Sequence, residues 1–404
     1  MLTHAGLLDI QETKCQLQEC QQEPERFWEG WKASEARSRW VSPPPQKLLH
    51  RIIADLVVSR LAHSWVIVDQ EMSLFSDTAP ILSIVNLLSP MPDADTLWQA
   101  NSPSDWLMAF ESVHGSSYSN PSSLRQLFTR FVAGEIAESG AVIPPLHLRL
   151  LLHPLQTQVC QLRQFLTCLP DGGSHAKASR TVSKAATKAR LEEISMLLQQ
   201  WYSISKQSAS NRQETCWTTC ANLIMYHLIS LNAITSFKDI EQFARREVVV
   251  GPFRHAAWLQ SRCIDQAEET SFHCGQVLRL IRSMPEQVRP PWWAGAIYRV
   301  ALTYWANSMA NAGSRFPTSG HSVETDRPIA IDVLTPEDPA ITRYLKYQEG
   351  QPVLSKPDGS FISTDVPNNI LKYCIDLLEE DSSMRLTDGI KRKLRIFLAG
   401  WKES

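Results

Sequence analysis

The sequence predicts an all-α fold, a large irregular multi-helix domain with one small β-hairpin near residues 353–362. Three observations lead to this prediction. Apolar residues recur at helical spacing through most of the chain, and proline, glycine and serine clusters divide it into segments of helix length. The 404 residues are 43% hydrophobic and include 13 Trp, and such a content of bulky aromatic residues favours a substantial packed interior.

The first predicted helix is centred on an apolar stripe. Its members follow one another at steps of 4, 3, 4 and 3 residues and are Leu61, Trp65, Val68, Met72 and Phe75. This spacing places all five on one side of a helix, and an amphipathic helix normally turns such a stripe toward the core.

More helices are predicted before residue 170, around Trp98, after Asp105, over 122–140 and over 146–169. Pro154 lies inside the last of these. Because its ring removes one backbone hydrogen bond and crowds the preceding turn, we expect it to bend that helix.

Residues 171–190 are interpreted as a flexible basic linker. Residues 171–188 combine Gly172 and Gly173 with several Ser and Thr and four dispersed cations. A nuclear-import signal is the alternative, but dispersed cations are more typical of a solvated loop. The linker divides the helical domain into an N-terminal part, residues 1–170, and a C-terminal part, residues 191–404.

The C-terminal part is predicted to be helical apart from one hairpin. Helical patterns cover residues 191–201, 219–231, 239–243, 258–281, 290–304, 368–380 and 387–401. The pattern over 258–281 is the strongest and predicts one continuous helix. Lys356-Pro-Asp-Gly359 is a turn sequence between Val353-Leu354 and Phe361-Ile362, an arrangement typical of a small hairpin.

The composition argues against several classes of protein. The formal net charge is −2, which gives no global electrostatic reason to bind nucleic acid or an anionic membrane. The longest apolar runs, 148–152 and 223–234, are too short to span a bilayer, and no secretory signal is recognised. The nine cysteines are odd in number and contain no Cys-x-x-Cys pair, so neither a disulfide framework nor a zinc site is expected.

The cysteine candidates for chemistry are expected to be structural. Cys216 and His227 lie about three helical turns apart, or roughly 16 Å, which is too far for a thiol nucleophile and its base. Cys263 and Cys274 fall on the apolar face of a helical pattern. Both are therefore predicted to be core residues.

The acidic candidates are weak as well. His321, Glu324 and Asp326 form the best metal-like cluster, but they lack a helical histidine pair. The run Asp69–Glu71 supplies carboxylates that point apart on a helix, so one of them is expected to be a helix-surface or interhelical hydrogen-bond partner. We assign no catalytic, cofactor-binding or metal-binding residue and predict a protein that is not an enzyme.

An aromatic ligand pocket between helices is a further hypothesis, because bundle cavities are often apolar with a few polar groups. The candidate lining residues are Trp28, Trp31, Trp98, Trp106, Trp292 and Trp293. For any one of them, ordinary core packing is the simpler interpretation.

Two sets of Trp, Arg and acidic residues carry a family resemblance. The first comprises Trp28–Arg39, Trp65–Phe75 and Leu97–Trp106, and the second comprises Phe237–Arg246, Ala267–Arg282 and Arg289–Arg299. They resemble the large helical regulatory region of fungal zinc-finger and binuclear zinc cluster transcription factors. That region is called the fungal-specific transcription factor domain or middle homology region.

The resemblance implies transcriptional regulation in a fungal nucleus. The expected partners are proteins of the transcription machinery or a homodimer partner, and some members also bind a small-molecule effector. The resemblance further implies that this region contacts DNA only indirectly and does not bind a membrane. The opening residues Met1–Leu8 resemble the interior of the region, so we expect a truncated or DNA-binding-deficient regulator. Zinc would belong to a missing N-terminal module, and no cofactor is expected in this chain.

Residues 40–60 depart from the family pattern. About 20 extra residues, including Pro43–Pro45, separate Glu35–Arg39 from the helix of Trp65. Two hypotheses account for these extra residues. One is a gene-model artefact such as a retained intron, and the other is a real inserted loop or helix extension. A helical ligand-binding or scaffold protein unrelated to transcription remains the alternative function.

Overall fold

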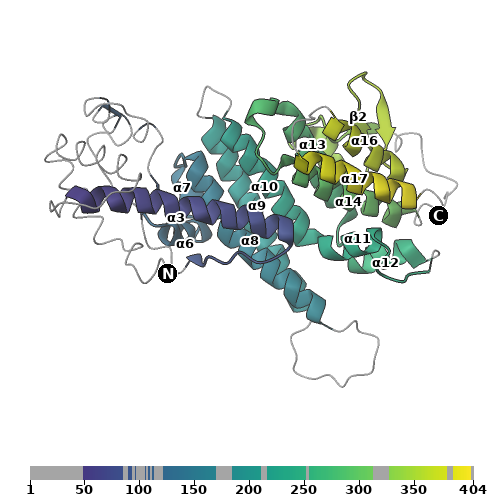
Figure 1. Ribbon diagram of the computed structural model, residues 1–404, viewed down its shortest axis with the longest axis horizontal. Coiled ribbons are helices and arrows are strands. Elements are labelled where there is room, and N and C mark those ends of the chain that lie inside the picture. Colours follow the sequence, from purple (N-terminus) through teal and green to yellow (C-terminus); the bar gives the residue numbers. More distant parts are fainter. Residues whose placement is uncertain are drawn as a thin grey trace. The chain divides into compact units, whose positions relative to one another are not determined.

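The computed structural model describes residues 49–84, 90–92, 122–169, 184–210, 216–251, 254–312, 327–379 and 385–401, with a few positions between 96 and 112. These residues are mostly helical and include one three-stranded sheet (Figure 1). The predicted all-α class with a small β element is therefore confirmed. No helix in the described ranges is long and apolar enough to cross a membrane.

The described residues fall into two compact units. The first lies within Met1–Ser73, Pro80–Leu155 and Ser203–Arg212, and the second lies within Leu74–Ala79, Gln156–Tyr202 and Gln213–Ser404. Residues 156–169 and 184–202, on either side of the predicted linker, thus belong to the same unit.

The first unit is built from α3 (Leu49–Ser76), α6 (Leu124–Val132), α7 (Glu135–Ser139), the beginning of α8 (Pro145–Cys168) and the end of α9 (Lys184–Ser210). Helix α6 starts with a capping box. The Ser123 hydroxyl accepts a hydrogen bond from the Gln126 amide at 3.2 Å, and the Gln126 side chain accepts one from the Ser123 amide at 3.1 Å.

Four of the five residues in the predicted apolar stripe of α3 are exposed, contrary to expectation, and the fifth, Phe75, is half-buried. The side of the helix with Leu61, Trp65 and Met72 is 53–66% exposed, whereas Val66 and Gln70 are fully buried. The reason is electrostatic. Acidic groups of α3 beside the buried stripe pair with bases on α8, and buried polar groups need such partners.

Two of these pairs confirm the interhelical role predicted for the run Asp69–Glu71. Glu71 accepts a hydrogen bond from the buried guanidinium of Arg149 at 2.9 Å. The Asp69 carboxylate lies 3.6 Å from His153 Nε2 and accepts hydrogen bonds from the amides of Ile81 and Leu82.

The second unit is centred on α14 (Trp293–Ala312). The helices that pack most extensively against it are α11 (Phe237–Ala244), α12 (His255–Arg262), α13 (Ala267–Ser283), α16 (Pro367–Glu379) and α17 (Arg385–Gly400) (Figure 1). Helix α10 (Trp217–Ile234) packs on α13, and η3 (Glu286–Val288) leads toward α14. The face of α14 predicted to be buried is confirmed, with Trp293, Ile297, Val300, Ala301 and Tyr304 at 0–2% exposure.

The small sheet contains the predicted hairpin. Strand β2 (Gln351–Ser355) pairs antiparallel with β3 (Phe361–Ser363), and Leu354 lies opposite Ile362. Gly359 closes the turn with a φ of 81°, a conformation that suits glycine. A third strand, β1 (Pro328–Ala330), pairs parallel with β2 and was not predicted. Helix α15 (Pro339–Tyr347) connects β1 to β2.

A buried carboxylate attaches this sheet to the helices. The Asp332 side chain is fully buried and forms an ion pair with Arg282 of α13 at 2.7 Å. It also accepts hydrogen bonds from the Tyr373 hydroxyl of α16 at 2.8 Å and from the Ser355 amide of β2 at 3.0 Å. One carboxylate therefore links two helices to the strand.

Two helix boundaries differ from those predicted. Helix α9 begins at Lys184, so residues 184–190 of the predicted linker are helical, while 171–183 lie outside the described residues. Residues 49–60, which belong to the stretch 40–60 that departs from the family pattern, are part of α3, so this helix begins earlier than predicted.

The continuous helix predicted over 258–281 is wrong, because α12 ends at Arg262 and α13 begins at Ala267. The backbone between them bonds to the end of α10 instead. The Asp265 amide donates to the Ile234 carbonyl at 2.9 Å, and the Ser236 amide donates to the Cys263 carbonyl at 2.8 Å. The chain therefore leaves the helical path between Arg262 and Ala267.

Candidate functional site

Of the cysteines singled out from the sequence, Cys263 and Cys274 lie in the core, whereas Cys216 is half-buried. Cys216 is the N-cap residue of α10, and His227 is buried farther along the same helix. Cys263 and Cys274 are 1% and 0% exposed, which confirms that both are core residues. Burial raises the pKa of each of these two thiols, so both stay protonated at neutral pH.

The tryptophans of the pocket hypothesis that the structure describes are also core residues. Trp292 packs 5.8 Å from the Phe75 ring, and the Arg289 guanidinium lies 5.0 Å above the Trp293 ring. The others, and the cluster of candidate metal ligands, lie outside the described residues: Trp28, Trp31, Trp98, Trp106, His321, Glu324 and Asp326. In the part of the chain that the structure describes, no group of three His, Cys, Asp or Glu side chains can hold a metal ion.

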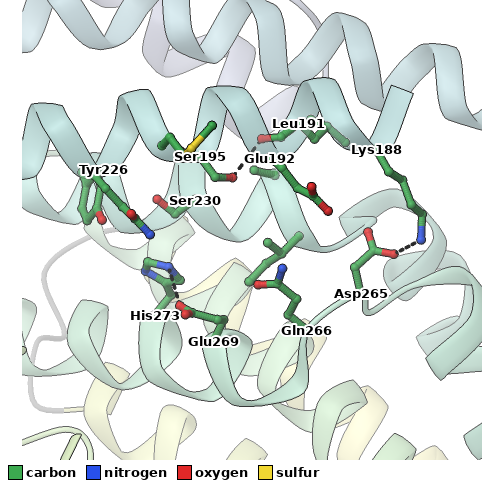
Figure 2. Close-up of a pocket in the computed structure, with 14 residues that line it drawn as sticks. Lys188, Leu191, Glu192, Ser195, Tyr226, Ser230, Asp265, Gln266, Glu269 and His273 are labelled. Atoms are coloured by element: carbon green, nitrogen blue, oxygen red, sulfur yellow. Dashed lines mark hydrogen bonds and ion pairs between the residues drawn. The ribbon is translucent and has the colours of Figure 1, made fainter. Parts of the chain in front are cut away.

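The second unit contains a cavity of about 300 Å³ bounded by α9, α10 and the start of α13 (Figure 2). Its apolar lining comes from Leu191, Met196, Tyr226, Ala233 and Ile234. Its polar lining comes from Lys188, Glu192, Ser195, Gln199, Ser230, Asp265, Gln266, Glu269 and His273. An apolar wall with several convergent polar groups is typical of a small-molecule site.

One end of the cavity is fixed by Asp265, which precedes α13. Its carboxylate pairs with Arg163 of α8 at 2.8 Å and with Lys188 of α9 at 2.6 Å. The Arg163 guanidinium also donates to the backbone carbonyls of Asn232 and Ala233 at the end of α10. Burial opposes ionisation of Asp265, but the two cations hold its pKa below the ordinary value. The two ion pairs join α8 and α9 to the segment before α13 at this end of the cavity.

The other end contains His273, which contacts a second buried imidazole. The Nδ1 atoms of His227 and His273 are 2.8 Å apart, so one ring donates the hydrogen bond and the other accepts it. Burial lowers the pKa of His273 to about 3, and burial, His273 and Arg279 lower the pKa of His227. Both rings are therefore neutral at pH 7. An aromatic cluster surrounds them, with Tyr226 6.0 Å from His273 and Phe272 5.8 Å from His227.

Acid is expected to destabilise the protein through this pair. Below the unfolded pKa of about 6.5, the unfolded chain binds a proton at His273 that the folded chain excludes until pH approaches about 3. Stability therefore falls with decreasing pH in that window. Replacing His273 with glutamine should reduce the loss of unfolding free energy between pH 7 and pH 5 by about 2 kcal/mol.

Urea unfolding of the wild type and of His273→Gln at each pH measures this effect. Between pH 7.5 and 8.5 the two proteins should show the same pH dependence, because the histidine is neutral in both states there. An unchanged loss between pH 7 and pH 5 would contradict the excluded proton.

Two carboxylates face the cavity without a cationic partner. Glu269 of α13 has its carboxylate 3.6 Å from His273 Nε2, but this ring is neutral. Burial and the neighbouring Glu268 raise the pKa of Glu269. Glu192 of α9 forms neither an ion pair nor a hydrogen bond within the described ranges. The ammonium of Lys188 is held by Asp265, so this part of the cavity wall is negative.

The structure thus defines a helical domain with a cavity of small-molecule size. Comparisons with known proteins identify proteins of similar sequence. The chain is 40% identical to a protein named a transcription factor in Zymoseptoria tritici, over 98% of the chain and 40% of the relative. It is 38% identical to Transcription factor 1 of Elsinoe fawcettii, over 98% and 39%. It is 32% identical to Transcription factor PfmaH of Pestalotiopsis fici, over 99% and 39%.

The chain is therefore a homologue of fungal proteins named as transcription factors, and it spans about 40% of their length. This confirms the resemblance at the level of fungal transcription factors. No known protein family and no solved structure matches the chain.

Proposed function

We propose that the chain is a regulatory region of a fungal transcription factor, of the fungal-specific transcription factor domain type. In this proposal it acts in the nucleus through protein partners or a homodimer partner, contacts DNA only indirectly, performs no catalysis and responds to a small molecule. The observation that carries the proposal is the similarity of nearly the whole chain to proteins named as transcription factors.

The described structure supports a regulatory role by its chemistry. Two carboxylates of the second unit are used in packing: the buried Asp332 attaches the sheet, and Asp265 joins α8 and α9 to the segment before α13. The cavity between α9 and α10 offers a place where a small molecule can bind to both helices and α13. A ligand that binds only the folded arrangement stabilises it by mass action.

A reporter assay tests the proposal. The chain is fused to a bacterial DNA-binding domain and expressed in a fungal host whose reporter carries the matching operator. We expect reporter output to differ several-fold from that of the DNA-binding domain alone, because the region recruits or excludes partners. A fusion carrying Asp332→Ala, which removes the buried ion pair, is expected to return to that baseline.

Two outcomes would contradict the proposal. The first is a wild-type fusion that leaves the reporter at the level of the DNA-binding domain alone. The second concerns indirect DNA contact: the purified chain would bind DNA fragments with sequence preference in an electrophoretic mobility-shift assay. Gly389→Ala serves as the matched control, because its added methyl group meets open space and should leave the reporter response unchanged.

A further inference from the structure

We propose that the cavity between α9, α10 and α13 binds a primary amine cation with a compact apolar body. This inference rests on the proposed function, because it names the class of the effector, and its binding test needs no transcriptional readout. The argument combines the volume of the cavity, the position of its apolar wall and the uncompensated charge at one end.

The volume and the wall define the body of the ligand. About 300 Å³ accommodates a single ring with a short side chain. Apolar side chains reach the cavity from two helices, Leu191 and Met196 from α9 and Ala233 and Ile234 from α10. Burying apolar ligand surface there contributes roughly 25 cal/mol per Å² before the costs of association.

The charge defines the head group. Glu269 of α13 and Glu192 of α9 face the cavity from opposite sides (Figure 2). A carboxylate that is partly removed from water gains most from a charge-assisted hydrogen bond, and an ammonium supplies three donors.

The cations of this region are already engaged. Lys188 and Arg163 share the carboxylate of Asp265, and Arg163 further donates to two backbone carbonyls. His273 beside Glu269 is neutral, and it hydrogen-bonds to His227 on its other side. A bound amine would therefore supply a positive charge that none of the described residues places next to Glu269.

Isothermal titration calorimetry on the purified chain tests the inference with three probes of similar shape. They are phenethylamine (a cation), 2-phenylethanol (neutral) and 3-phenylpropionate (an anion). We expect phenethylamine to bind at least about tenfold more tightly than the alcohol, since one charge-assisted hydrogen bond contributes about 1.4 kcal/mol or more, and we expect the carboxylate to bind most weakly.

Substitutions locate the site. Glu269→Gln keeps the shape and removes the charge, so it should weaken phenethylamine binding at least about tenfold while leaving 2-phenylethanol binding unchanged. Glu192→Gln should give a smaller loss, because Glu192 is exposed, and provides a second variant if the first fails to fold. Glu193→Gln is the matched control, since Glu193 pairs with Arg190 and does not line the cavity.

The inference is overturned if the amine and the alcohol bind equally, if the carboxylate binds best, or if none of the probes binds at millimolar concentration. A change in Glu193→Gln equal to that in Glu269→Gln would also overturn it. A failed reporter assay combined with selective amine binding would instead count against the transcriptional role alone.

Discussion

Replacing Asp332 with alanine is expected to lower the free energy of unfolding by about 3–5 kcal/mol. The change removes the ion pair of a fully buried carboxylate with Arg282 and leaves the Ser355 amide without its acceptor. The Tyr373 hydroxyl also loses the group to which it donates. Urea unfolding followed by circular dichroism measures the effect.

Two further substitutions calibrate the Asp332 result. Tyr373→Phe removes only one hydrogen bond and should cost about 1–2 kcal/mol. Glu379→Ala breaks a surface ion pair with Arg395 in the same unit and should cost less than about 1 kcal/mol. If Asp332→Ala costs no more than Glu379→Ala, then the buried carboxylate does not attach the sheet to the helices.

Replacing Gly275 with alanine is expected to destabilise the protein by about 1–3 kcal/mol, although alanine is the better helix former. A Cβ atom at this position of α13 would lie 2.6 Å from the Ile331 carbonyl oxygen. The clash is with backbone, so α13 and the segment after β1 must separate. That movement also disturbs Asp332, which follows Ile331 directly.

Gly389→Ala in α17 is the matched control for Gly275→Ala, because no atom lies within 4 Å of its added Cβ. It should stabilise the protein by up to about 1 kcal/mol through helix propensity. The two glycine substitutions are therefore expected to act in opposite directions in the same thermal or urea unfolding measurement. A stabilising Gly275→Ala would show that α13 and β1 are not in close contact.

The sequence predicted the helical class and several buried faces, because apolar spacing and burial coincide where helices pack on helices. The face of α14 that contains Trp293 and Ile297 is an example. The same reasoning failed for α3, where Gln70 is buried and Trp65 is exposed. Spacing identifies a stripe on a helix, but the partners on another helix decide which side turns inward.

The break between α12 and α13 was missed because neither glycine nor proline marks it and the apolar spacing continues through it. Its cause, the pairing of Ile264 with Thr235, is a tertiary contact. The cavity was missed for a similar reason, since Lys188 and His273 line the same cavity only in the folded chain. The available signal was the presence of His227 and His273 within strongly apolar helical segments.

The parallel pairing of β1 with β2 has a consequence for the order of folding. The Asp332 carboxylate reaches the Ser355 amide across 23 residues of chain, and helix α15 lies between them. The entropy of closing such a loop must be overcome before the contact contributes any stability. We therefore expect the sheet to form only when α15 is in place, because that helix lies within the loop that the Asp332 contact closes.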